Sequence, residues 1–192
     1  MTHIWVRSES RAHEERVGLT PHGAAKLLAA GYAVTVEESR QRILPIADYA
    51  AVGCTIAPEF SWVDAPDDAI IFGLKELPED GTPLRHRHIM FGHAYKGQPS
   101  GQILLERFKV GGGTLFDLEY LTQADGRRVA AFGYWAGYAG AAVALMCWLA
   151  QQNGRIAGPV KAYPSAKHML TELQQGLDVL GAARPTALII GA

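Results

Sequence analysis

The 192-residue sequence lacks several features that would place it in a special class of protein. It has only two cysteines, Cys54 and Cys147, which lie far apart and without CxxC spacing, so neither a disulfide framework nor a zinc site is indicated. Lys and Arg number 18 against 19 Asp and Glu, and the net charge of -1 gives no general attraction to nucleic acid or to an anionic membrane. The N-terminus lacks the apolar core of a signal peptide. We therefore expect a cytoplasmic protein without bound metal or nucleic acid.

A long uncharged run occupies residues 129–150, VAAFGYWAGYAGAAVALMCWLA. It is long enough to span a bilayer, and Gly133 and Gly137 have the GxxxG spacing of packed membrane helices. Half of its residues are Ala or Gly, however, which have weak affinity for hydrocarbon and allow close packing in a water-soluble protein. We predict a buried helix here, with a single membrane span as the less favoured alternative. Any part of this helix that stays exposed would favour self-association.

Apolar runs alternate with helical segments in the first two thirds of the sequence. Thr20 is a typical N-cap residue, Pro21 suits the first helical position and Gly31 follows the last turn, so a helix is expected before a strand at residues 33–37. Further strands are expected at residues 3–7, 54–57, 69–74, 89–92 and 114–118, and further helices at residues 46–52, 100–109 and 164–177. This alternation predicts an α/β fold, a Rossmann-like parallel sheet with flanking helices.

The predicted elements divide the chain into three parts. Residues 1–126 would form a substrate-side α/β domain, residues 127–153 an interdomain helix, and residues 154–192 a linker, a helix and the first strand of a truncated dinucleotide-binding domain. The final TALIIGA is typical of the strand before a dinucleotide loop, but no Gly-rich turn or helix follows it. The glycine triplet at residues 111–113 precedes a strand instead of opening a helix, so it carries little weight as a phosphate loop.

Two of the apolar runs end abruptly in ionisable residues. Lys75 and Glu76 follow the first, and His93 and Lys96 follow the second. Because the carboxyl ends of parallel strands border the ligand crevice, Lys75 and His93 could face one substrate and move protons. In the alternative interpretation, Lys75 and Glu76 are a solvated loop pair and His93 is a hydrogen-bonded core residue, and spacing alone slightly favours it. The polar run at residues 8–16 is likewise expected to be a solvated loop.

Longer motifs add to these patterns. They are RSESRAHEERVGLTP, IIFGLKELPE, FGHAYKGQ, GGTLFDLEYL and GRRVAAFGYWAGYAGAA. The sequence resembles the NAD-dependent, lysine-forming saccharopine dehydrogenases in these motifs, and more distantly the N-terminal domains of alanine dehydrogenase and transhydrogenase. The resemblance implies oxidation of saccharopine by NAD to an imine, which is hydrolysed to L-lysine and 2-oxoglutarate. The alternatives are a reductive aminase similar to alanine dehydrogenase and a non-catalytic module that binds a small ligand.

The resemblance also implies roles for individual residues. Lys75 would accept a proton and His93 would donate one, while Lys96 and Glu119 would tune the charge around this pair. The implied contacts with saccharopine are made by Arg16, Glu76, Gln98, Arg128 and Phe132. Arg127 matches a contact with NAD, which would be bound mainly by residues beyond Ala192. On this basis the chain is expected to be the N-terminal part of the enzyme and to be inactive alone.

The residue types suit this chemistry independently of the resemblance. Saccharopine carries three carboxylates, and a planar guanidinium can clamp a carboxylate with two parallel hydrogen bonds. Nearby Arg or Lys charges would favour the neutral amine that Lys75 needs as a base, and Glu76 would oppose them. Position 11 is Arg, where Lys is more usual in the family. His86 and His88 match no family role, and we expect them in a solvated loop because no carboxylate or Cys lies at metal-ligand spacing.

Overall fold

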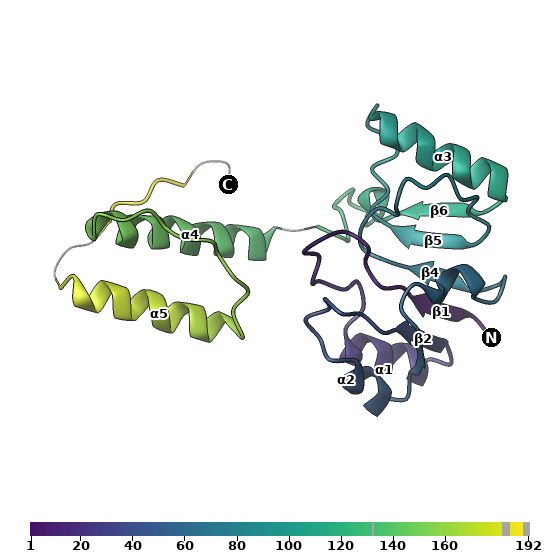
Figure 1. The fold of residues 1–192 in the computed structure, drawn as a ribbon, viewed down its shortest axis with the longest axis horizontal. Helices are drawn as coiled ribbons and strands as arrows, with labels where there is room; N and C mark the ends of the chain where they lie inside the picture. The colour runs from purple at the N-terminus through teal and green to yellow at the C-terminus, as the bar shows by residue number, and fades with distance from the viewer. Residues whose placement is uncertain (132, 182–184, 190–192) are drawn as a thin grey trace. The chain divides into compact units, whose positions relative to one another are not determined.

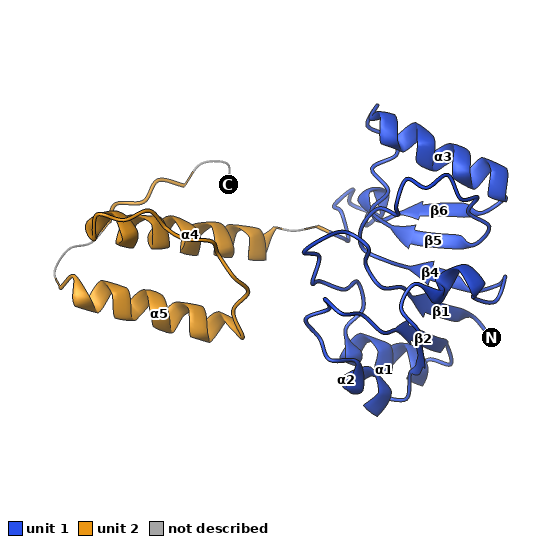
Figure 2. Ribbon diagram, in the orientation of Figure 1, with its two compact units in different colours: residues 1–130 blue, residues 131–192 orange. Residues whose placement is uncertain are grey.

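The computed structural model of the chain describes residues 1–131, 133–181 and 185–189. It divides into two compact units, residues 1–130 and residues 131–192, which are coloured separately in Figure 2. The first unit therefore extends a little beyond the predicted boundary at residue 126. The assignment of separate roles to the parts of the chain stays a prediction.

The first unit is built on a six-stranded parallel sheet with strand order β3-β2-β1-β4-β5-β6 (Figure 1). The strands are β1 His3–Val6, β2 Ala33–Glu37, β3 Thr55–Ala57, β4 Ile70–Phe72, β5 Arg87–Met90 and β6 Thr114–Asp117. The predicted Rossmann-like α/β fold is thereby confirmed. The direction of strand order reverses between β1 and β4, and in such sheets the ligand crevice lies at that switch point.

Three helices and two short 3-10 turns flank this sheet. They are α1 Pro21–Ala29, α2 Ile46–Ala51, η1 Ser61–Asp64, α3 Pro99–Gly111 and η2 Leu118–Tyr120. The hydroxyl of Thr20 accepts a hydrogen bond from the Gly23 N–H at 3.2 Å, which confirms the predicted start of α1. Helix α1 packs on Val6 of β1, whereas α3 packs on Met90 of β5, whose side chain points to the opposite face of the sheet.

The glycine triplet after α3 serves close packing. Gly112 has a φ of +72° and caps the C-terminus of α3, a left-handed conformation that favours glycine. A Cβ at Gly111 or Gly113 would lie only 2.3 to 2.4 Å from backbone oxygens of Leu84 and His86. The triplet thus lets α3 and β6 approach the chain that enters β5, which agrees with its poor match to a phosphate loop.

The prediction that His86 and His88 lie in a solvated loop is wrong. Strand β5 begins at Arg87, and both histidines are only 1% exposed. Alternate residues of a strand share one face, and on this face the His88 ring makes edge contacts with Trp62 and Phe108, each at 5.3 Å between ring centroids. Within the described part of the chain, neither ring nitrogen of His88 has a hydrogen-bond partner. The two histidines of the RHRH motif therefore belong to the core, whereas Arg85 and Arg87 are exposed.

The second unit consists of α4 Tyr134–Gln152 and α5 Ala166–Val179, which pack together around Ala142, Met169 and Leu173. Helix α4 begins later than the predicted residue 129, because the backbone of residues 128 and 129 pairs with an earlier segment instead. Arg128 forms a bridge with Thr122, and the Val129 N–H donates to the Leu121 carbonyl at 2.8 Å.

Two further expectations concern this unit. Within it, Ala142 is the one residue of α4 that is fully buried, and the rest of the helix is partly or largely exposed. The strand expected at residues 186–192 is not formed over residues 185–189, where Leu188 and Ile189 are exposed, and residues 190–192 lie outside the described residues. A strand requires a neighbouring strand to pair its backbone groups, and this segment has none within the described residues. No helix in the described ranges is both long and apolar enough to cross a membrane.

We expect the substitution His88→Leu to make the protein less sensitive to acid. Burial lowers the pKa of His88 to about 3, and the positive charges of Arg7, His86 and Arg107 act in the same direction. An unfolded histidine binds a proton near pH 6.5, so stability present above that pH is lost as the pH falls towards 3, by up to about 1.4 kcal/mol per pH unit. Urea unfolding across this pH window would show a shallower loss in the variant.

The matched control is His22→Leu, since His22 is exposed in the first turn of α1. Its unfolding free energy should follow the wild-type pH dependence. Equal slopes for the wild type and His88→Leu would contradict the expectation.

Candidate active site

The loop that carries Lys75 is anchored to the end of β1 by a buried ion pair. The carboxylate of Glu9 accepts hydrogen bonds from the N–H groups of Leu74 at 2.7 Å and Lys75 at 3.0 Å. Nη1 of Arg7 lies 3.3 Å from Oε2 of Glu9, and Nη2 of Arg7 donates to the carbonyl of Lys75. Both backbone polar groups of Lys75 are therefore held by side chains that follow β1.

Arg7 is enclosed where it crosses from β1 to β4. Burial lowers the pKa of Arg7, and the negative charges of Glu9 and Glu37 oppose that shift. A Cβ at Gly73 would lie 2.3 Å from Nε of Arg7, so the chain needs a glycine at this position for the guanidinium to reach the Lys75 carbonyl.

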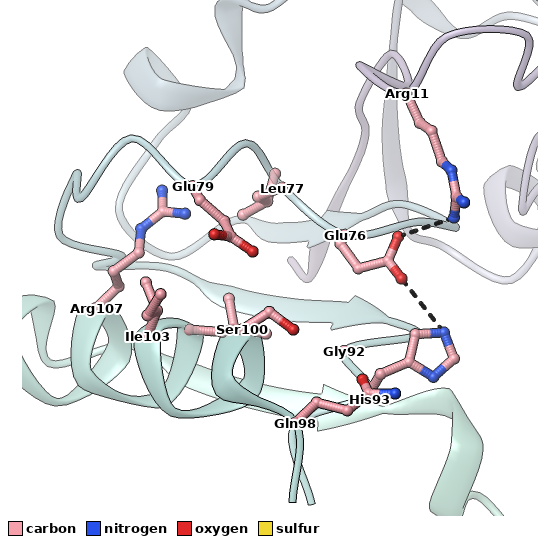
Figure 3. A pocket seen from close by; sticks show the side chains of 11 residues that line it. Arg11, Glu76, Leu77, Glu79, Gly92, His93, Gln98, Ser100, Ile103 and Arg107 are labelled. Carbon is pink, nitrogen blue, oxygen red and sulfur yellow. Dashed lines mark ion pairs between the residues drawn. The ribbon is translucent and has the colours of Figure 1, made fainter. Parts of the chain in front are cut away.

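His93 follows β5 and lies between two carboxylates. Its Nδ1 is 2.9 Å from Oε2 of Glu119. Its Nε2 is 3.4 Å from Oε1 of Glu76, a contact that Figure 3 marks with a dashed line. With Glu76 following β4 and Glu119 following β6, the ends of three neighbouring strands contribute to one cluster. Nδ1 is occupied by Glu119, so Nε2, which faces Glu76 beside the cavity, is the ring nitrogen that could exchange a proton with a ligand.

The backbone around His93 is fixed by Asp117, the last residue of β6. Its Oδ1 accepts hydrogen bonds from the N–H groups of Gly92 at 3.3 Å and Glu119 at 2.9 Å. His93 itself has a φ of +49°, a left-handed conformation that is unfavourable for histidine and is often held at functional sites. One carboxylate thus positions the backbone next to both partners of the His93–Glu119 contact.

Glu119 contacts more basic side chains than the other carboxylates of this cluster. Nζ of Lys96 lies 2.6 Å from Oε1 of Glu119, and Nη1 of Arg128 lies 3.5 Å from the same oxygen. The hydrogen bond from Lys96 is the largest cause that lowers the pKa of Glu119, with His93 contributing and desolvation opposing. The Glu119 carboxylate therefore stays ionised at pH values where an ordinary glutamate would begin to bind a proton. It holds cations from two separate loops.

Two arginines lie in the segment that follows β1, and one of them reaches the cluster around His93. Nη1 of Arg11 lies 3.5 Å from Oε2 of Glu76, which places Glu76 between Arg11 and His93 (Figure 3). Arg16 binds Glu14 with two nitrogens, at 2.7 and 2.5 Å. The pKa of Glu14 is lowered mainly by Arg16, and the positive charge of Lys75 makes a smaller contribution in the same direction.

A cavity of about 300 Å³ opens beside His93. Figure 3 shows Gln98 and Ser100, at the start of α3, facing Glu76 and Arg11 across it. Its wall is mostly polar or charged, and at the end away from His93 the side chains of Glu79 and Arg107 lie near Ile103. The cavity can accept part of a charged ligand next to the proposed acid.

The predicted site residues do not all gather in this cluster. Glu76, His93, Lys96, Glu119 and Arg128 are joined by the contacts above, and Gln98 lines the cavity. Lys75 is linked to His93 only through its neighbour Glu76, so their convergence on one substrate stays a prediction. Arg127 is exposed and pairs with Asp125 at 2.7 Å. Phe132 lies outside the described residues.

Sequence reasoning missed four residues that build the site: Arg7, Glu9, Glu14 and Asp117. The first three belong to or adjoin the polar run that was expected to be a solvated loop, yet Glu9 and Glu14 are each only 5% exposed. Their position directly after a central strand was the available signal, because the ends of parallel strands lie at one edge. Among the residues that the structure describes, no group of three or more His, Cys, Asp or Glu could hold a metal ion.

Comparison with known families agrees with this architecture. Residues 5–139 match the family described as alanine dehydrogenase/PNT, N-terminal domain. The chain belongs to this family. The expected resemblance to saccharopine dehydrogenases is also confirmed by curated relatives. Saccharopine dehydrogenase [NAD(+), L-lysine-forming] of Yarrowia lipolytica is 45% identical over 196 residues, which cover 98% of this chain and 53% of the relative.

Other relatives extend the comparison. The enzyme of the same name from Neurospora crassa is 45% identical, with 100% of this chain and 52% of the relative covered. The mitochondrial alpha-aminoadipic semialdehyde synthase of Rattus norvegicus is 28% identical over 70% of this chain and 14% of its own length. The chain spans about half the length of the saccharopine dehydrogenases it matches.

Solved structures confirm the fold of the family. An L-alanine dehydrogenase aligns with a TM-score of 0.51 at 17% identity, covering 79% of this chain and 40% of the other. The transhydrogenase from Sinorhizobium meliloti gives the same TM-score and identity, with 79% of this chain and 43% of its own covered.

We expect Lys96→Met to raise the pKa of Glu119 towards the ordinary value of a glutamate, because Lys96 is the largest cause of its lowering. Side-chain carboxyl ¹³C NMR titration would measure this shift. Lys109→Met is the matched control, since Lys109 pairs with Glu106 on α3. A Glu119 titration that is the same in wild type and Lys96→Met would contradict the expectation.

Proposed function

We propose that this chain supplies the acid-base and substrate-binding residues of an NAD-dependent saccharopine dehydrogenase. The observation that carries the proposal is His93, placed between Glu76 and Glu119 on loops that follow three adjacent strands. The support from comparison is 45% identity to enzymes of that name along nearly the whole chain.

The proposed chemistry is a sequence of proton transfers around one carbon–nitrogen bond. The chemistry that NAD would supply when bound is acceptance of a hydride from the saccharopine carbon that carries the secondary amine, with an imine as the product. Lys75 takes up the proton released from the nitrogen. Water then adds across the imine to give a carbinolamine. His93 donates a proton to its nitrogen, the hydroxyl group gives up its proton to solvent as the carbonyl forms, and the carbon–nitrogen bond breaks to give L-lysine and 2-oxoglutarate.

The charges around the cavity suit a substrate with several carboxylates. Arg16 and Arg128 are assigned to those carboxylates, because guanidinium groups can bind them in a bidentate manner. Both arginines are roughly half exposed, with side-chain exposures of 52% and 42%, and can therefore reach a ligand. Glu76 and Gln98 would contact the polar atoms of the substrate next to His93.

The remaining assigned residues act on charge and on the cofactor. Lys96 and Glu119 form the 2.6 Å contact beside His93 and set the charge that the acid experiences. The exposed guanidinium of Arg127 suits an anionic part of NAD. The other residues that bind NAD are assigned to sequence beyond Ala192.

We expect Lys75→Met and His93→Gln each to lower kcat for saccharopine oxidation by about 10²- to 10⁴-fold, the usual contribution of a general acid or base. The assay follows NADH absorbance in the full-length protein in which this sequence naturally occurs, with the 192-residue chain measured alongside. Pyruvate with ammonia is the second substrate arm, which tests for a reductive aminase.

The matched controls for these variants are Lys109→Met and His22→Gln, both on exposed helix surfaces. They should keep wild-type kcat and KM. Turnover with pyruvate and ammonia but not with saccharopine would reject the proposed substrate. Tight saccharopine binding without turnover in every form would instead indicate a ligand-binding module.

We also propose that the chain self-associates through α4. Tyr134 and Trp135 at its start are 75% and 64% exposed, and their rings pack in an edge contact at 5.1 Å. Exposed aromatic side chains of this kind favour burial against a partner. Light scattering should show a mass that rises with concentration, and Trp135→Ser should reduce that rise. A monomer at every concentration tested would refute this.

A further inference from the structure

We propose that Glu9, together with Arg7, is a positioning residue for Lys75. The inference rests on the proposed role of Lys75 as a proton acceptor. It concerns how the backbone of a catalytic loop is held in place, and not a group that touches the substrate.

The hydrogen bonds of the sheet continue a short way past the last residue of β4. The N–H of Arg7 donates to the Phe72 carbonyl at 3.0 Å, and the Gly73 N–H donates to Ile89 at 3.0 Å. Beyond these bonds, the Phe91 N–H still binds the Leu74 carbonyl at 3.2 Å from the β5 side. On the β1 side the chain has turned away, and the Glu9 carboxylate takes over as the acceptor for Leu74 and Lys75.

At Lys75, side chains bind the backbone groups that a neighbouring strand would otherwise pair. Its N–H is held by Glu9 and its carbonyl by Arg7, and these two groups are themselves an ion pair. Hydrogen bonds to ionised groups are short and strong, so the peptide on either side of Lys75 has little freedom. A displacement of about 1 Å in a reacting group can cost about 10²-fold in rate.

A second buried carboxylate provides a control that distinguishes a positioning effect on Lys75 from a general loss of stability. Glu37, at the end of β2, is fully buried and accepts the N–H groups of Ser8 at 2.8 Å and Phe60 at 3.0 Å. It supports the same edge of the sheet but makes no hydrogen bond to the Lys75 loop in the described residues. Loss of Glu37 should therefore reduce stability without a specific effect on Lys75.

The test compares Glu9→Gln with Glu37→Gln in the full-length protein that naturally contains this sequence. In Glu9→Gln, the single amide oxygen can replace only one carboxylate oxygen, so the NH₂ group would face either the Leu74 N–H, or the Lys75 N–H together with the Arg7 guanidinium. We expect Glu9→Gln to lower kcat by about 10- to 100-fold with KM for saccharopine changed by less than about threefold. Both variants should lower the melting temperature by similar amounts. Glu37→Gln, however, should keep kcat within about threefold of wild type.

A double-mutant cycle with Lys75→Met gives a second readout. If Glu9 acts through Lys75, adding Glu9→Gln to Lys75→Met should lower any residual turnover by less than about threefold. A full additional loss in that background, or equal kcat losses in Glu9→Gln and Glu37→Gln, would overturn the inference. Undiminished turnover in Lys75→Met would instead overturn the proposed role of Lys75 itself.

If Glu9→Gln does not fold, Glu9→Asp replaces it in the same comparison. The shorter side chain keeps the charge beside Arg7 but cannot reach both N–H groups. A lower kcat with an unchanged melting temperature would support positioning, and a wild-type kcat would reject it. Amide hydrogen exchange in the wild type should show slow exchange at Leu74 and Lys75, whereas fast exchange there would count against the hydrogen bonds to Glu9.

Discussion

The ion pair of Arg7 and Glu9 is the interaction on which the rest of the candidate site depends. It stands at the end of β1, beside β4, where the strand order reverses and a ligand crevice forms. Burying two charges is costly, and here the cost is offset because the carboxylate accepts two backbone N–H groups and the guanidinium binds two carbonyls. Removing one partner would leave a buried charge unpaired, at a cost of about 3 to 5 kcal/mol. The loop with Lys75 is thus fixed by the same bonds that keep β1 and β4 together.

The carboxylates at this edge fall into two groups with different effects. Glu9 and Asp117 bind backbone N–H groups and so determine where the loops after β4 and β5 run. Glu76 and Glu119 bind the side chain of His93 and so determine where its ring lies. The first group explains how His93 can keep a left-handed φ of +49°, since the Gly92 N–H beside it is held by β6. The position of the His93 ring between Glu76 and Glu119 therefore depends on the backbone that Glu9 and Asp117 hold in place.

The sequence was informative wherever local chemistry decides the structure. Thr20 and Pro21 predict the start of α1, and the ionisable residues after two apolar runs predict the loops of Lys75 and His93. It was misleading wherever a distant partner decides. Residues 8–16 look solvated by composition, and only the arrival of β4 beside β1 buries Glu9. His88 enters the core because Trp62 and Phe108 cover it, and α4 begins after Arg128 because Thr122 pairs with that backbone.

The two carboxylates beside His93 differ in how firmly they are held, so one side of the cluster can rearrange more easily than the other. Glu119 is only 10% exposed and has two cations on one oxygen, whereas Glu76 is 39% exposed and meets Arg11 at 3.5 Å, with Arg11 itself 59% exposed. Exposed ion pairs contribute about 0 to 1 kcal/mol, so a carboxylate of the ligand could replace Glu76 at Arg11 at little cost. Glu76 would then keep its contact with His93 without Arg11, while Glu119 keeps the ring in place. A charged ligand would therefore rearrange the solvent side of the cluster and leave its buried side unchanged.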